Sequence, residues 1–381
     1  MAGAGDVQLT VRLPSWLTPH RAVLLGLIAL VAYTVALAAV DSGDEGFGYP
    51  VVALGRSLLI VVLVSGVVTY VCAAVIRVPP NSDSWLITAL ILFFVMPVGV
   101  DTATMKAVAL GAAAASLSKY VLVWRRRLIV NPVVAGAVTC YAFTVAQVGG
   151  IAYLSWWVAS AQLLIPMLVV GVVVVTVLRE WPLLLVYVAA ALGTAVIAAS
   201  LHETGQSVSV IVRSTPLLFL GVFMLPEPLT SPSTRTARLF YGMLVGALMY
   251  SSVHFAVTDT FMFAFDPEIA LLVGCLFAFG VRLAAGTARR VAMRVVTAPI
   301  AASTYAVAGD AQPHFRPGQW ATLSMPRWGW PLWRRSRRVF SFASVPGAPA
   351  EFAFTVNGGA SPFKTGVDRE RPADVGRQHR R

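Results

Sequence analysis

Leu54 to Ile76 reads LGRSLLIVVLVSGVVTYVCAAVI, a run that carries a single charged side chain, Arg56. A helix needs about 20 consecutive apolar residues to cross the hydrocarbon core of a bilayer, and this run meets that length. Across the whole chain, 57% of the residues are hydrophobic and only 12% are charged. The sequence therefore predicts an α-helical, polytopic integral membrane protein that lies in a lipid bilayer.

The same rule predicts about ten membrane-spanning helices in residues 21–290, after an N-terminal segment of residues 1–20. The expected ranges are 21–40, 54–76, 84–100, 103–123, 132–150, 153–178, 182–200, 208–225, 237–255 and 268–287. Arginines precede the first range and follow the even-numbered ranges, whereas acidic residues occupy most of the alternate loops. By the positive-inside rule we expect a multi-pass protein of the bacterial plasma membrane with both termini in the cytoplasm.

The formal net charge of +12 does not by itself indicate a nucleic-acid partner. Of the 29 lysines and arginines, 16 lie from Arg282 onward, and most of the others lie at the ends of apolar runs. This distribution is typical of membrane topology combined with a basic cytoplasmic domain, so we expect no nucleic acid.

Neither the cysteines nor the histidines are spaced for a metal or haem site. Cys72, Cys140 and Cys275 are far apart and form no CxxC pair, which argues against an iron–sulfur cluster or a zinc site. A b-type haem needs paired intramembrane histidines, and the five histidines provide no such pair within the expected helices.

Two similar segments suggest an internal duplication. Phe94 to Pro97 (FVMP) lies in the third expected helix, and Phe223 to Pro226 (FMLP) lies in the eighth. An offset of five helices is odd, so the two halves would be inverted in the membrane, as in transporters with broken helices. The alternative is that two unrelated prolines lie near helix ends.

Three segments of the membrane region resemble a known family. Leu217 to Leu248, with Asn131 to Gly136 (NPVVAG) and Ser155 to Val158 (SWWV), is similar to the ten-helix membrane subunit of Rnf-type and sodium-pumping NADH:quinone oxidoreductase complexes. That family consists of flavin-bearing electron carriers. The resemblance implies a membrane flavin or ion site at Asn131 and at the acidic, proline-rich loop that contains Glu227 and Thr230. For Glu227, the alternative is that it caps the helix that follows.

Covalent FMN in that family is attached through the Thr of a Ser-Gly-Ala-Thr motif. This sequence has Ala159-Ser160-Ala161-Gln162 at the comparable place, and Ser160 is its only hydroxyl. We therefore expect either a non-covalent flavin or no flavin in the membrane. The alternative is a phosphoester link from FMN to Ser160.

A different pattern begins after the last apolar run, in Arg337 to Ser344 (RRVFSFAS). Alternate residues of a strand share one face, so Arg338 and Phe340 can be presented together. The run resembles the flavin-binding signature of the ferredoxin-reductase family. The resemblance implies that Arg338 holds the FAD pyrophosphate, that Phe340 packs on the isoalloxazine and that Ser341 bonds the flavin edge.

The flanking segments have the order found in that family. His314 to Pro326 (HFRPGQWATLSMP) is similar to its preceding turn and strand, and the segment with Gly359 and Ser361 is similar to its second phosphate contact. We expect residues 291–365 to form a partial β-barrel that binds FAD. The alternative is an ordinary small β-domain with no cofactor.

The last residues, 366–381, are charged and lack any strand pattern, so we expect them to be disordered. We also expect no nucleotide-binding domain. Either a separate soluble electron donor or reductase subunit delivers the electrons, or the chain is a truncated or frame-shifted form of a longer fusion. The predicted function is a membrane-bound, flavin-dependent oxidoreductase in electron transport. The alternative function is a membrane channel or transporter with a non-functional, truncated flavin domain.

Overall fold

The computed structural model describes the helical region and parts of the C-terminal region. The described residues are 18–40, 47–78, 80, 82–124, 127–202, 216–250, 254–258, 261–264, 266–284, 294–295, 304–308, 320–325, 336–341 and 351–355. The chain divides into two compact units, Met1–Gly286 and Thr287–Arg381, and each is treated by itself.

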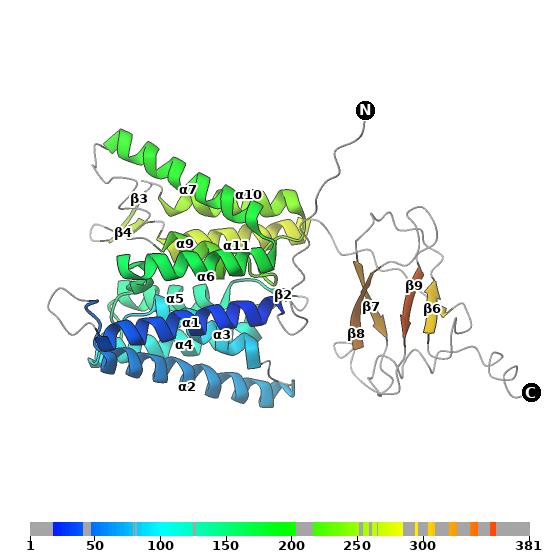
Figure 1. The fold of residues 1–381 in the computed structure, drawn as a ribbon, viewed down its shortest axis with the longest axis horizontal. Coiled ribbons are helices and arrows are strands. Elements are labelled where there is room, and N and C mark those ends of the chain that lie inside the picture. The colour runs from blue at the N-terminus through cyan, green and yellow to red at the C-terminus, as the bar shows by residue number, and fades with distance from the viewer. Residues whose placement is uncertain are drawn as a thin grey trace, which may run out of the picture. The chain divides into compact units, whose positions relative to one another are not determined.

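The first unit is a bundle of helices (Figure 1). Its helices are α1 (Pro19–Val40), α2 (Val51–Ile76), α3 (Ser82–Val95), α4 (Thr102–Val121), α5 (Pro132–Val145), α6 (Leu164–Leu178), α7 (Trp181–His202), α9 (Leu217–Phe219), which continues as the π-helix η3 (Leu220–Met224), α10 (Arg235–Met249) and α11 (Pro267–Ala284). Among the described residues, five helices are long and apolar enough to cross a membrane: α1, α2, α6 with the turn before it, α7 and α11. These helices confirm the prediction of a helical, multi-pass membrane protein.

Each of the ten expected ranges contains a described helix, but several predicted bounds are wrong. The third helix ends at Val95 rather than at residue 100. The sixth was expected from residue 153, yet α6 begins only at Leu164, after two 3-10 turns, η1 (Trp157–Ala159) and η2 (Ala161–Leu163). Gly149, Gly150 and Trp156 have positive φ angles of 79°, 56° and 44°, which a right-handed helix cannot accommodate.

Two short helices, α3 and the helix formed by α9 with η3, occupy the centre of the bundle. All residues from Ile87 to Met96 are buried, as are those from Phe219 to Pro226. The rings of Phe94 and Phe219 lie 5.4 Å apart, so the short helices contact each other directly. Each one stops shortly before a proline, which cannot continue the hydrogen-bond ladder of a helix.

The same order of elements occurs twice in the bundle. Each copy begins with two apolar helices, which are α1 and α2 in the first copy and α6 and α7 in the second. A short buried helix follows, and after it another helix, α4 or α10. A two-stranded hairpin and a helix that begins with an Xaa-Pro pair complete each copy. The hairpins are β1 (Val123–Trp124) with β2 (Arg127–Leu128), and β3 (His254–Thr258) with β4 (Phe261–Ala264). In Figure 1, β3 and β4 lie at the opposite end of the bundle from β2. The two hairpins therefore lie at opposite ends of the bundle.

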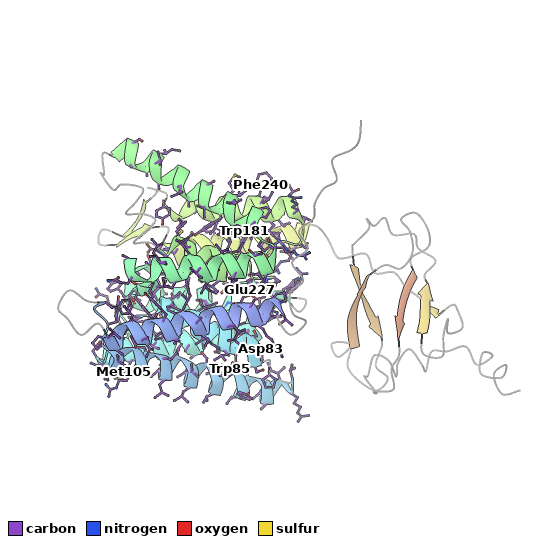
Figure 2. All side chains as sticks on the ribbon, viewed as in Figure 1. Asp83, Trp85, Met105, Trp181, Glu227 and Phe240 are labelled. Carbon is purple, nitrogen blue, oxygen red and sulfur yellow. The ribbon has the colours of Figure 1, made fainter. Side chains whose placement is uncertain are left out.

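We call the end of the bundle that carries β1 and β2 the basic end. The described arginines at this end lie near helix termini or in β2: Arg21, Arg77, Arg127, Arg179, Arg235, Arg238 and Arg282. Arg238 pairs with Glu180 at this end, which joins the start of α10 to the start of α7. Figure 2 shows side chains of the helical unit.

Close packing of α7 against α10 depends on Gly246. A Cβ atom at this position would lie 2.3 Å from the Tyr187 carbonyl oxygen, which is backbone and cannot move aside. We expect Gly246→Ala to lower the free energy of unfolding by about 1–3 kcal/mol, because overpacking forces the helices apart. The measurement is unfolding of the purified protein by titration from mild detergent into SDS.

Gly193 in α7 is the matched control for this substitution. A Cβ atom there would meet no atom within 4 Å. Gly193→Ala should therefore raise stability by about 0.5–1 kcal/mol through helix propensity alone. Equal effects of the two substitutions would contradict the packing argument.

The second unit contains only strands among its described residues. One sheet has three antiparallel strands in the order β5 (Arg294–Val295), β6 (Thr304–Ala308) and β9 (Glu351–Thr355). The other pairs β7 (Trp320–Met325) with β8 (Ser336–Ser341), also antiparallel.

Candidate functional site

Asn131 links the two halves of the bundle at the basic end. It precedes Pro132 at the start of α5, and its Oδ1 accepts a hydrogen bond from the Val133 N–H at 2.9 Å, as an N-cap does. Its Nδ2 donates to the Met224 carbonyl oxygen at 3.3 Å. Asn131 is only 2% exposed. It thus caps the start of α5 and the end of η3 with one side chain.

The loop after η3 is folded on itself. The Glu227 carbonyl oxygen accepts bonds from the N–H of Ser231 at 2.9 Å and of Thr230 at 3.2 Å. Thr230 and Ser231 are buried. Thr234, not Glu227, caps α10, because its Oγ1 accepts from the Ala237 N–H at 3.4 Å.

Glu227 as a whole residue is half-buried in this loop. Burial raises its pKa, while the nearby positive charges of Lys119 and His20 oppose that shift. The Lys119 Nζ itself donates to the Ser84 carbonyl oxygen at 2.8 Å and to Ser84 Oγ at 3.2 Å. The loop from one half of the bundle therefore carries an acidic group beside a lysine from the other half.

Two further buried groups adjoin this loop. Cys275 in α11 interacts with the Asn131 backbone and with the Thr230 hydroxyl. Tyr241 in α10 is fully buried, and its hydroxyl has no hydrogen-bond partner among the described residues. Asn131, Thr230 and Glu227, which the sequence analysis singled out, are thus brought together with Cys275 and Tyr241. We call this group the basic-end polar cluster.

Asn131→Asp tests the double cap. The carboxylate can still accept from the Val133 N–H, but it cannot donate to the Met224 carbonyl, which is then left buried without a partner. We expect a loss of about 1–3 kcal/mol in the free energy of unfolding. Asp101→Asn is the control, since Asp101 caps α4 at an exposed position by accepting from the Thr104 N–H at 2.9 Å, which Asn can also do. A similar loss in the control would contradict this account.

A second polar contact lies at the opposite end of the bundle. The Trp156 Nε1–H donates to Glu268 Oε2 at 2.9 Å, and Glu268 is 3% exposed. The sequence did not lead us to predict this contact for either Trp156 or Glu268. The Asp266-Pro267-Glu268 start of α11, analogous to Asn131-Pro132, was the signal that could have indicated it.

The loop before η1 caps the end of α3. The Trp156 N–H donates to the Val95 carbonyl at 3.2 Å, Trp157 Nε1–H to the Phe93 carbonyl at 2.6 Å, and Ser155 Oγ to the Met96 carbonyl at 3.4 Å. Glu268 fixes this loop through Trp156. We call Ser155, Trp156, Trp157 and Glu268 the tryptophan clamp.

Ser160 lies apart from the basic-end polar cluster. It lies between η1 and η2, beside the tryptophan clamp, and its buried hydroxyl has no hydrogen-bond partner among the described residues. The four membrane residues expected to form one flavin or ion site are therefore divided between the two ends of the bundle.

The flavin-signature residues of the second unit lie on β8. Arg338 is opposite Leu323 of β7, Phe340 is opposite Ala321, and Ser341 is opposite Trp320. The alternation of a strand gives Arg338 and Phe340 a common face. The predicted phosphate contacts Gly359 and Ser361 lie outside the described residues.

Among the described residues, no three or more His, Cys, Asp or Glu side chains gather as they would around a metal ion. No protein-family model matches the chain, and no curated protein is significantly similar to it.

Proposed function

We propose that this chain is a membrane-bound, flavin-dependent electron-transport protein that passes electrons between a soluble donor and the membrane. The observation that carries the proposal is the pairing of β8 with β7, since it gives Arg338 and Phe340 one face of a strand in a compact unit of its own. A guanidinium group matches phosphate oxygens with two parallel hydrogen bonds, and an aromatic ring offers a flat apolar surface to a flavin. FAD presents both a pyrophosphate and a flat ring system.

The membrane unit in this proposal is a ten-helix, inverted repeat of five plus five helices with both termini in the cytoplasm of a bacterium. The repeated order of elements and the arginines of the basic end support it. By its resemblance to the Rnf-type subunit, the unit would relay electrons, with non-covalent FMN at the basic-end polar cluster as a second cofactor. The Tyr241 hydroxyl, which has no hydrogen-bond partner among the described residues, is the group there that could bond a flavin.

Visible absorption of the purified full chain tests the proposal. Flavin absorbs near 450 nm, and acid extraction followed by chromatography separates FAD from FMN. We expect FAD at about one equivalent per chain. Protein that contains no flavin after expression in flavin-sufficient cells, and that takes up none when FAD is added, would overturn the proposal.

A second function is favoured by one observation. Two broken helices meet at Phe94 and Phe219 in the centre of the bundle, and each ends at a polar cluster or clamp. Inverted repeats with such helices serve solute transport, so a channel or transporter with a non-functional flavin domain is the competing proposal. Solute flux in proteoliposomes of flavin-free protein would favour it.

A further inference from the structure

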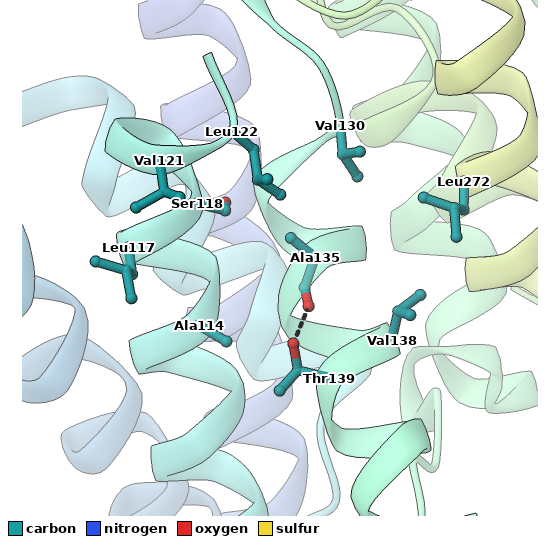
Figure 3. Close-up of a pocket in the computed structure, with 10 residues that line it drawn as sticks. All are labelled: Ala114, Leu117, Ser118, Val121, Leu122, Val130, Ala135, Val138, Thr139 and Leu272. Atoms are coloured by element: carbon teal, nitrogen blue, oxygen red, sulfur yellow. Dashed lines mark hydrogen bonds between the residues drawn. The ribbon is translucent and has the colours of Figure 1, made fainter.

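An apolar groove opens between α4, α5 and α11 (Figure 3). Its volume is about 450 Å³, within the range of about 300–1,000 Å³ that is usual for small-ligand sites. Its walls include Leu117, Val121, Leu122, Val130, Val138 and Leu272. Leu117 and Val121 are 48% and 65% exposed, so the groove faces the surroundings of the bundle.

The two hydroxyl groups in the groove wall do not make it polar. Ser118 Oγ donates to the Ala115 carbonyl oxygen and Thr139 Oγ1 to the Ala135 carbonyl oxygen, each at 2.7 Å within its own helix. Figure 3 shows the second of these bonds. With their hydrogens used in this way, the wall is suited to a hydrocarbon chain rather than to a polar solute.

One edge of the groove, at Val130, lies at the basic end near two arginines, and we call this edge the mouth. Val130 of the groove wall follows β2 by two residues, and the Arg282 Nη2–H donates to the Leu128 carbonyl oxygen at 3.0 Å. Arg127 precedes Leu128 in β2, and its positive charge acts on Arg282. Trp124, which pairs with Arg127 in the hairpin, is 49% exposed, as is typical of tryptophans at a membrane interface.

No acidic side chain among the described residues neutralises these two arginines. Arg282 donates to three carbonyl oxygens, those of Ala278, Leu229 and Leu128. These bonds occupy three of its five N–H donors, but neutral carbonyl groups do not neutralise its positive charge. Two like charges beside each other at the membrane surface are stabilised by an anion that binds both.

We propose that this groove binds one anionic phospholipid, with the phosphate held by Arg127 and Arg282 and one acyl chain lying between α4, α5 and α11. The charge of the mouth selects the anionic headgroup, and the apolar wall selects a long chain. This site is independent of any flavin and therefore of the proposed function.

The experiment measures the lipid that stays with the full chain. The purified protein is loaded in detergent with equal amounts of dioleoyl-phosphatidylglycerol and dioleoyl-phosphatidylcholine and washed, and the retained lipid is counted by native mass spectrometry. We expect phosphatidylglycerol to be retained in preference to phosphatidylcholine. Arg127→Gln should lower its affinity about fivefold, because each basic residue near a membrane surface contributes on that scale. Arg282 is left intact, since its three carbonyl contacts hold the fold.

Two matched controls separate the headgroup from the chain. Arg77→Gln removes an exposed arginine at the same end but away from the groove, and it should leave retention unchanged. Ala114→Leu fills the groove wall and should lower retention, whereas Ala189→Leu on the exposed face of α7 should not. Equal retention of the two lipids, an equal effect of Arg77→Gln, or no effect of Ala114→Leu would each overturn the proposal.

Discussion

Arg338→Ala is expected to lower the affinity of the full chain for FAD about ten- to a hundredfold. In the proposed FAD complex, the substitution removes a charge-assisted hydrogen bond to phosphate, which contributes about 1.5–3 kcal/mol. Arg338 lies in β8 of the second unit, so the helical unit should keep its detergent stability. Equilibrium titration of flavin-depleted protein with FAD, followed by flavin fluorescence, gives the affinity.

Arg337→Ala is the internal control for this prediction. Arg337 lies opposite Ser324 of β7, and strand alternation gives it the other face from Arg338. Its loss should weaken only the general attraction for phosphate, an effect that added salt removes. If both substitutions lower FAD affinity equally at high salt, or neither does, then Arg338 does not bind the pyrophosphate. The basic run would then be better explained as a membrane-surface patch.

Trp156→Ala is expected to lower the free energy of unfolding of the helical unit by about 3–5 kcal/mol. The substitution leaves a cavity where an indole ring, 8% exposed, was packed. It also leaves the Glu268 carboxyl group buried without its N–H donor. SDS titration of the purified protein measures the loss.

Trp156→Phe and Glu268→Gln separate packing from hydrogen bonding. Phe keeps most of the ring but lacks the N–H, so about 1–3 kcal/mol of the loss should remain. Gln keeps an oxygen that accepts from the indole, so Glu268→Gln should be close to neutral. Trp124→Phe, at an exposed position, should have almost no effect. A Trp156→Phe protein as stable as the parent would show that the indole N–H contributes nothing to the tryptophan clamp.

The positions of the helices could be predicted because bilayer thickness imposes a long apolar run on every span. Arg77 and Arg179 each follow an apolar helix in a left-handed conformation, with φ of 56° and 58°, and the sequence indicated both helix ends from charge alone. The start of α6 could not be predicted in this way. Residues 153–163 are as apolar as a helix, and tertiary contacts of Trp156 and Trp157 with α3 outweigh their local propensity.

Sequence reasoning found part of the candidate site. Asn131, Glu227 and Thr230 lie near one another because each borders an Xaa-Pro break, and proline breaks can be seen in a sequence. Cys275 and Tyr241 were not associated with them, because a cysteine and a tyrosine in apolar helices give no local signal. The separation of Ser160 from the others depends on which end of the bundle each loop reaches, a property of the whole topology rather than of any short motif.

The tryptophan clamp and Asn131 differ in whether the cap is synthesised before or after the helix end that it caps. The end of α3 is capped by residues 155–157 and secured by Glu268, all of which are synthesised later. If α3 enters the membrane as it is made, its last carbonyl groups lack these partners, and an unpaired carbonyl in hydrocarbon costs several kcal/mol. By contrast, Asn131 is synthesised before η3, so its amide is available to the Met224 carbonyl as soon as that carbonyl is made. The end of α3 thus stays uncapped until the second half of the bundle has been synthesised. We expect insertion factors to be needed most between the emergence of α3 and that of α11.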